Sequence, residues 1–318
     1  MVTGGAGYIG SVIGVRLLEA GHQVTAYDDL SRGHRAAVAP DADLVVGDVR
    51  DTGRLTAELR ERGCTAIVHM AALAEVGESV VRPDLYRDVN TAGTESLARA
   101  AAAAGVERIV FSSTAAVYGQ PDEMPITEGA AAAPTNPYGH TKLAAELVLF
   151  APDAPFSVAA LRYFNACGAY GACGEDHRPE THLLPLALRA ARDGSTLAVF
   201  GDDYPTPDGT CVRDYVHVAD LADAHISALE RLPGCAGACN LGTAHGHSVT
   251  EVLDAVQTVT GRPVARRAEA RRAGDPPALV ADNRRAATLL GWRPRHGLLD
   301  AARDAWDWMQ AHPGGYED

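Results

Sequence analysis

The first half of the chain alternates short apolar runs with stretches whose apolar residues recur at helical spacing. The runs at 24–27, 44–46, 66–69, 108–112 and 157–162 contain little polar alternation, as expected for strands that are covered on both faces. Helices are predicted between them, among others at 10–20, 93–104 and 138–150, and Gly21 and Gly105 follow two of these helices as C-caps do. The alternation predicts βαβ units and a doubly wound parallel sheet of the α/β class.

The pattern changes after residue 165. Residues 166–211 contain many Gly, Pro, Asp and His residues, and the one helix expected there, at 183–192, stands alone. A strand is predicted at 212–218, then a helix through 232 and two more helices at 250–260 and 298–312. We therefore predict a first domain over 1–165, with a contribution from 212–238, and a smaller α/β domain over 166–318.

Composition narrows the class of protein. Apolar residues make up 47% of the 318 residues, and 28 basic against 41 acidic residues give a net charge of -13. This charge argues against a sequence-independent nucleic-acid binder, which needs a basic surface. No apolar stretch approaches the roughly 18 residues of a membrane span, and no signal-peptide pattern is present. We expect a cytoplasmic protein that binds neither nucleic acid nor membrane.

The cysteines and histidines predict no metal site. None of the six cysteines forms a CxxC pair, which favours reduced structural thiols. His245 and His247 lack a third ligand at helical spacing, so a loop is expected there. The basic residues are unusual in another way, because 27 are Arg and one is Lys, at position 142.

A glycine-rich turn near the N-terminus predicts a dinucleotide site of the Rossmann type. Glycines at 4, 7 and 10 stand between a strand and a helix, where backbone N–H groups can approach a pyrophosphate. Asp28 ends the next strand, 21 residues after Gly7, close to the spacing of the carboxylate that binds the adenosine ribose. A carboxylate repels a 2′-phosphate, so NAD is favoured over NADP, although Arg32 softens this preference.

The first strand is short for such a site. Only three residues precede the glycine turn, whereas a strand usually has about five or six. Either this strand is trimmed or the assigned start of the chain lies a few residues late.

Tyr138 and Lys142 form the candidate catalytic pair. They are four residues apart at the start of a predicted helix, so the phenol and the ammonium share one face. An ammonium and a positively charged nicotinamide both favour the phenolate and are expected to lower the tyrosine pKa. Thr114 ends the strand before this helix, where its hydroxyl can relay a proton or hold a substrate oxygen.

These motifs resemble the extended short-chain dehydrogenase/reductase family, and within it the UDP-glucose 4-epimerases of galactose metabolism. The resemblance rests on the TGGAGYIG loop, Thr114 and the YGHTK segment at 138–142, and it continues to the end of the chain. It includes VGES at 76–79, LRYFN at 161–165, FGDDYPT at 200–206, DGTCVRDY at 208–215, RRAGD at 271–275 and His312-Pro313.

The resemblance implies bound NAD, a nucleotide-sugar substrate and a homodimer formed through helices around 93–104 and 139–150. It implies a cofactor site made of Gly4, Gly7, Tyr8, Ile9, Gly10, Asp28, Asp29, Leu30, Ser31, Asp48, Val49, Met70, Ala71, Ala72, Ala74, Asn90, Ser112, Tyr138, Lys142, Tyr163 and Phe164. It implies a substrate site made of Thr114, Asn165, His182, Leu183, Val199, Phe200, Arg213, Arg272, Asp275 and Leu279.

The implied reaction is epimerisation at C4 of UDP-glucose or UDP-galactose through a 4-keto sugar, with Tyr138 as the base. Three positions depart from the family pattern: Ala74 replaces a frequent Lys, His182 a frequent Asn, and Leu279 a Tyr that restricts the sugar pocket. Epimerisation of UDP-N-acetylhexosamine, UDP-glucuronate or another nucleotide sugar therefore stays open. A 4,6-dehydratase is less favoured, because Ala115 and Ala116 stand where those enzymes carry an acid and a base.

Overall fold

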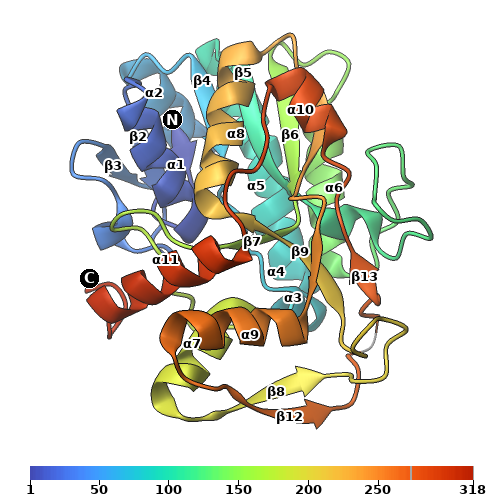
Figure 1. Ribbon diagram of the computed structural model, residues 1–318. Helices are drawn as coiled ribbons and strands as arrows, with labels where there is room; N and C mark the ends of the chain where they lie inside the picture. The colour runs from blue at the N-terminus through green and yellow to red at the C-terminus, as the bar shows by residue number, and fades with distance from the viewer. Residues whose placement is uncertain (273, 318) are drawn as a thin grey trace.

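The main sheet has seven parallel strands in the order β10-β6-β5-β4-β1-β2-β3 (Figure 1). The structure is a computed structural model that describes residues 1–272 and 274–317. The strands are β1 Val2–Thr3, β2 Thr25–Asp28, β3 Asp43–Val46, β4 Ala66–His69, β5 Arg108–Thr114, β6 Ser157–Tyr163 and β10 Gly237–Leu241. The strand order reverses between β1 and β4, and open α/β sheets bind their ligands at such a point.

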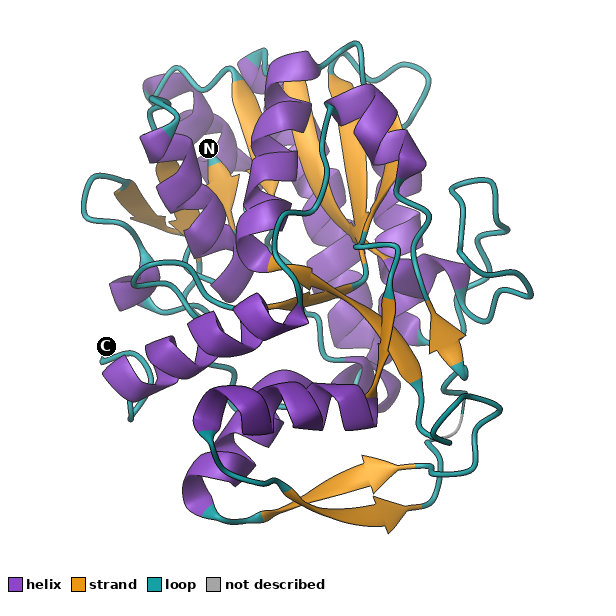
Figure 2. Cartoon of the chain, viewed as in Figure 1, coloured by secondary structure: helices purple, strands orange, loops and turns teal. Residues whose placement is uncertain are grey.

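Helices cover both faces of this sheet, as its apolar strands require (Figure 2). On one face α1 (Tyr8–Glu19) packs beside α8 (Val218–Arg231), and their core includes Val12, Ile13 and Leu221. The other face carries α2 (Thr52–Glu61), α5 (Gly93–Ala104) and α6 (Pro137–Leu149). The shorter helical elements are η1 Arg35–Ala37, α3 Val76–Val81, α4 Pro83–Tyr86, the π-helical η2 Arg87–Ala92, η3 Ala115–Tyr118 and α10 Arg284–Leu290. Of these, α10 packs against α8 and β10.

A second core lies below the sheet in the view of Figure 1. Its helices are α7 (Leu183–Asp193), α9 (Val249–Thr260) and α11 (Leu298–Ala311), and β8 (Thr196–Phe200) pairs in parallel with β12 (Ala265–Glu269). The apolar face of α7 buries Leu184 and Leu188 in the same core as Val252 of α9 and Met309 of α11. Within residues 166–211 α7 is the one helix, as expected, and its apolar face is completed by helices that lie far away in the sequence.

A small sheet joins the two parts. Its central strand β9 (Val212–His217) pairs with β7 (Asn165–Cys167), β11 (Gly246–Ser248) and β13 (Ala278–Leu279). The following helix α8 and strand β10 return to the main sheet, so the chain crosses between the two parts more than once. Within the described residues, no helix is both long and apolar enough to cross a membrane.

Candidate active site

One cavity of about 1020 Å³ lies beyond the carboxyl ends of the central strands. One wall is built from the glycine turn after β1 and from the segments that follow β2, β4 and β5. The opposite wall comes from α7, β8, β9 and β13. The volume of this cavity lies at the upper end of the range of ligand pockets, roughly 300–1,000 Å³, and the cavity meets the switch point of the sheet.

The glycine turn is shaped so that other residues do not fit. Gly4 has a φ of 68°, and a Cβ there would lie 2.5 Å from the backbone N of Ala71. A Cβ on Gly10 would lie 2.1 Å from the carbonyl oxygen of Gly4. The backbone at this turn, which we call the glycine cradle, is therefore packed too closely for a side chain at Gly4 or Gly10. It leads into the N-terminus of α1, where backbone N–H groups can bind the pyrophosphate of a dinucleotide.

Asp28 is held at the adjacent edge of the cavity. Its Oδ2 accepts a hydrogen bond from the N–H of Ala6 at 3.0 Å, and its Oδ1 accepts one from the N–H of Leu30 at 2.9 Å. Burial raises the pKa of this carboxyl above its usual value. Arg32 is paired with Glu78, which accepts two hydrogen bonds of 2.9 Å from its Nη2. Because Arg32 is engaged by Glu78, we expect Asp28 to bind the adenosine ribose, and this arrangement fits NAD better than NADP.

Three hydroxyl and amine groups meet on the cavity wall near the centre of the sheet. Asn136 caps α6 by accepting a hydrogen bond from the N–H of Gly139 at 2.8 Å, so the helix starts at a defined residue. That start places Tyr138 and Lys142 on one face, as the four-residue spacing predicts, and both line the cavity with Thr114. Lys142 is 3% exposed.

The charge state of this group differs from the sequence-based expectation. Burial raises the pKa of Tyr138 to about 12, and the hydrogen bond with Thr114 offsets part of that rise. Burial lowers the pKa of Lys142 to about 7, although Glu146 raises it. The Lys142 ammonium donates to the carbonyl of Ser112 at 2.8 Å. Phenolate formation therefore needs a further positive charge in the cavity, which the nicotinamide ring of NAD would supply.

The small sheet brings the expected substrate residues to the other wall. In its register Asn165 stands beside Tyr215, and Leu279 beside Arg213. Arg213 is paired with Asp275. These residues come from separate segments of the sequence, and all of them line the cavity.

Arg272 is exposed to solvent, but it also lines the cavity. Its guanidinium carbon lies 4.0 Å from the ring centroid of Phe200, which is a cation–π contact. Its neighbour Arg271 stacks instead on Tyr204 and donates to Asp203 at 2.6 Å. Arg272 and Arg213 therefore give this wall two guanidinium groups, which suit a diphosphate.

Comparison with known proteins identifies the family. The model of the NAD dependent epimerase/dehydratase family matches residues 1–242. UDP-glucose 4-epimerases of Streptomyces lividans and Lacticaseibacillus casei are each 47% identical to the chain, over 100% of it and 98% of their own length. The chain belongs to the UDP-glucose 4-epimerase family.

Solved structures of this epimerase family have the same fold. The UDP-glucose 4-epimerase of Brucella ovis in complex with NAD superposes with a TM-score of 0.93 at 46% identity, covering 96% of each chain. The enzyme of Bifidobacterium longum in complex with NAD⁺ and UDP gives 0.93 at 36% identity and covers 99% of each. A doubly wound parallel sheet and the family resemblance are thus confirmed.

Two of the residues expected at the cofactor site of this epimerase-family chain do not line the cavity. The side chain of Asn90 is buried, with Oδ1 accepting from the N–H of Leu73 at 2.8 Å and Nδ2 donating to Thr141 at 3.1 Å. It fixes the segment after β4 against α6. Leu30 has a φ of 59° and belongs to the turn that caps Asp28. The other expected residues line the cavity.

Several cavity residues of this epimerase-family chain were not expected from the sequence. Glu175 and His177 line the wall before α7, together with Arg189 on α7 and Cys211 before β9. Burial alone would lower the pKa of His182, but the carboxylates of Glu175 and Glu180 outweigh it and raise that pKa above its usual value. Glu175, His177 and Glu180 alternate with His182 within eight residues, and that spacing was the signal available in the sequence.

Proposed function

We propose that this protein interconverts UDP-glucose and UDP-galactose by inverting C4 of the sugar, with NAD as a bound cofactor. One observation carries the proposal: Tyr138 and Thr114 lie in a single cavity between the glycine cradle and the wall with Arg213. This arrangement supports a base for a sugar hydroxyl between a dinucleotide site and a diphosphate site.

NAD would take up the hydrogen of C4 as hydride and return it. The glycine turn and Asp28 would hold its pyrophosphate and adenosine ribose, and Lys142 would act near the nicotinamide ribose. The backbone cradle, in which a Cβ would collide, supports this placement. The remaining expected cofactor residues on the cavity wall would complete the site.

Tyr138 would accept the proton of the sugar 4-OH, with Thr114 holding that oxygen. General-base catalysis by a positioned side chain contributes about 10²–10⁴-fold to the rate. Arg213 and Arg272 would anchor the diphosphate while the 4-keto sugar turns over, so that the other face of C4 meets the hydride. Tyr138 would then return the proton to the same oxygen.

The rest of the substrate wall would set the choice of sugar and base. Asn165, His182 and Leu183 would contact the nucleotide sugar, Val199 and Phe200 the base, and Asp275 would orient Arg213. Leu279 lies on the wall where a larger side chain would narrow the sugar pocket. UDP-N-acetylhexosamine is therefore the second candidate substrate.

The assignment of the two domains is part of the same proposal. Residues 1–165, with α8 and β10, would form the cofactor domain, and most of 166–318 the nucleotide-sugar domain. We also propose a cytoplasmic homodimer. Leu147, 68% exposed, and Phe150, 37% exposed, leave an apolar surface at the end of α6 that supports a contact between copies.

The test is incubation of the purified protein with UDP-glucose, UDP-galactose, UDP-GlcNAc and UDP-glucuronate, with the products followed by NMR. We expect UDP-glucose and UDP-galactose to interconvert without added NAD. Tyr138→Phe should lower turnover about 10²–10⁴-fold while UDP still binds. Tyr170→Phe is the matched control, because Tyr170 contacts Arg16 and Glu19 away from the cavity. No interconversion of any sugar by the unaltered protein would refute the proposal.

A further inference from the structure

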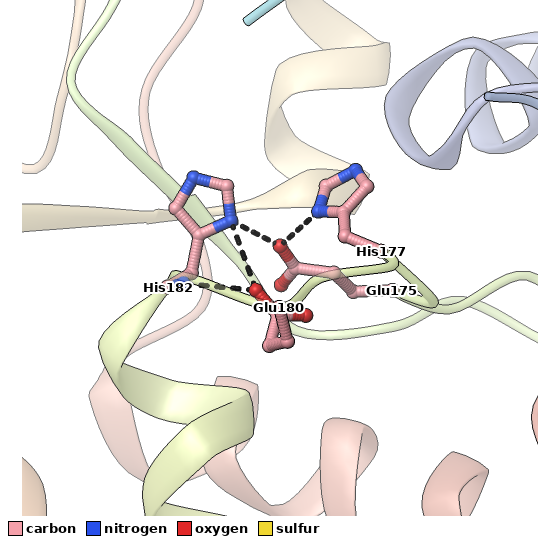
Figure 3. A group of neighbouring side chains, drawn as sticks. All are labelled: Glu175, His177, Glu180 and His182. Atoms are coloured by element: carbon pink, nitrogen blue, oxygen red, sulfur yellow. Dashed lines mark hydrogen bonds and ion pairs between the residues drawn. The ribbon is translucent and has the colours of Figure 1, made fainter. Parts of the chain in front are cut away.

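Two imidazoles and two carboxylates meet in the segment before α7 (Figure 3). One ligand atom of each side chain lies within 4.8 Å of the others. We call this group the 175–182 cluster; its members are Glu175, His177, Glu180 and His182. The reaction proposed above gives Glu175, His177 and Glu180 no role.

The cluster is compact around one carboxylate oxygen. Oε1 of Glu175 lies 2.5 Å from Nδ1 of His182 and 3.1 Å from Nδ1 of His177. Nδ1 of His182 is also 3.5 Å from Oε1 of Glu180. Zinc bonds of about 2.0–2.2 Å in a tetrahedron place ligand atoms about 3.3–3.6 Å apart. Small rotations of Glu175, His177 and His182 would therefore bring their ligand atoms around one ion beside the carboxylate of Glu180.

A buried oxygen in the cluster lacks a hydrogen bond. The side chain of Glu180 is 1% exposed, and its Oε2 has no hydrogen-bond partner among the described residues. The guanidinium of Arg189 is 4.0 Å from this oxygen. The other carboxylate oxygen of Glu180, Oε1, accepts hydrogen bonds from the N–H groups of Thr181 and His182 at 2.7 and 2.8 Å, and these bonds fix the carboxylate in place. A buried carboxylate oxygen without a donor is costly, and a bound cation would satisfy it.

We propose that the 175–182 cluster binds a divalent transition-metal ion of the Zn²⁺ class. Two carboxylates balance the double charge of the ion when both imidazoles are neutral. Two nitrogen donors favour Zn²⁺ or Co²⁺ over Mg²⁺ and Ca²⁺, which prefer ligand sets made of oxygen. Glu175, His177 and His182 line the cavity, so the ion would sit in its wall.

The test is titration of the purified, chelator-treated protein with ZnCl₂ alone, measured by calorimetry and equilibrium dialysis. We expect one Zn²⁺ per chain. Glu180→Gln keeps the oxygen that accepts the two backbone hydrogen bonds but removes a charge, and His177→Gln removes a nitrogen donor. Each should lower the affinity about tenfold or more. Circular dichroism of both variants checks that they are folded.

A control and a spectrum separate this site from other metal ligands of the chain. His245→Gln alters the His245–His247 pair, which lies outside the cluster, and should leave Zn²⁺ affinity unchanged. The Co²⁺-loaded protein should show d–d absorption without the intense near-ultraviolet band of a thiolate ligand, which Cys211 would produce. Absence of stoichiometric binding, cluster variants that bind Zn²⁺ as tightly as the unaltered protein, or a thiolate band would overturn the proposal. None of these results depends on whether the protein is an epimerase.

Discussion

At the scale of single residues, Lys142 occupies a space that fits an ammonium better than a guanidinium. It is the one lysine beside 27 arginines, and it is almost completely buried. Its Nζ lies 4.9 Å from the ring centroid of Phe111 and donates to Ser112. A compact ammonium fits this space, whereas a planar guanidinium with five N–H donors needs more room and more acceptors.

Lys142→Arg should therefore reduce turnover by at least about tenfold, because the larger group displaces the wall beside Tyr138. The measurement is kcat together with the amount of NAD released on denaturation. Arg99→Lys, an exchange at an exposed position on α5, is the control and should leave both values unchanged. Normal turnover in Lys142→Arg would mean that any cation suffices at this position.

At the scale of elements, a buried ion pair joins α6 to β6 behind the active site. Arg162 donates to Glu146 through Nε at 2.9 Å and through Nη2 at 2.6 Å. Ser113 at the end of β5 donates to the same carboxylate at 2.5 Å. The helix that carries Tyr138 and Lys142 is thus tied to the two strands beneath it.

Glu146→Ala should lower the free energy of unfolding by about 3–5 kcal/mol, because it leaves the buried guanidinium of Arg162 without its partner. Denaturation in guanidinium chloride measures this change. The exposed pair of Glu95 and Arg99 has an N–O distance of 4.0 Å on the neighbouring α5, and Glu95→Ala should cost about 0–1 kcal/mol. Equal losses in the two variants would contradict the role given to the buried pair.

The elements also show how much of the fold can be predicted from the sequence. The strands at 66–69 and the helix at 93–104 have the predicted bounds, because their apolar patterns are continuous and Gly105 ends the helix with a φ of 74°. The pairing of β8 with β12 was not predicted, because β12 is mostly exposed and contains two arginines. Its partner lies far away in the sequence, and local patterns carry no information on such pairing.

The site shows the same difference between residues with local sequence spacing and residues that meet only in the fold. Motifs with local spacing, such as the glycine turn and the pair Tyr138 and Lys142, were predicted from the residues themselves. The wall with Arg213 and Leu279 depends on strands that meet only in the fold, and the family resemblance supplied it. Neither source indicated that the amide of Asn90 bonds to Leu73 and Thr141 or that Lys142 donates to Ser112.

At the scale of the whole molecule, two imidazoles are buried at the main sheet, His69 in β4 and His225 in α8, which covers one face of the sheet. Burial lowers the pKa of His69 to about 3 and that of His225 to about 4. The unfolded chain takes up protons near pH 6.5, which the folded chain resists until lower pH. Stability from these groups is therefore complete above about pH 6.5 and declines as the pH falls below that value.

His69→Asn should remove part of this decline. Nδ1 of His69 lies 2.8 Å from Oγ1 of Thr3, and its Nε2 lies 3.0 Å from Oγ1 of Thr94. An Asn side chain keeps a polar group near Thr3. Between pH 7.5 and pH 5 the unaltered protein should lose about 2 kcal/mol of unfolding free energy more than the variant. Denaturation curves at the two pH values measure it. His245→Asn keeps the buried imidazoles and should retain the full decline, and the same decline in His69→Asn would disprove the assignment.

The proposed reaction also constrains the molecule as a whole. The hydrogen removed from C4 must return to the same carbon while Arg213 and Arg272 retain the diphosphate, so no hydrogen should enter C4 from solvent. The most direct test is incubation of UDP-galactose deuterated at C4 with the purified protein and no added NAD, followed by NMR and mass spectrometry. We predict UDP-glucose that keeps deuterium at C4. UDP-glucose with hydrogen at C4, or no UDP-glucose at all, would contradict the account.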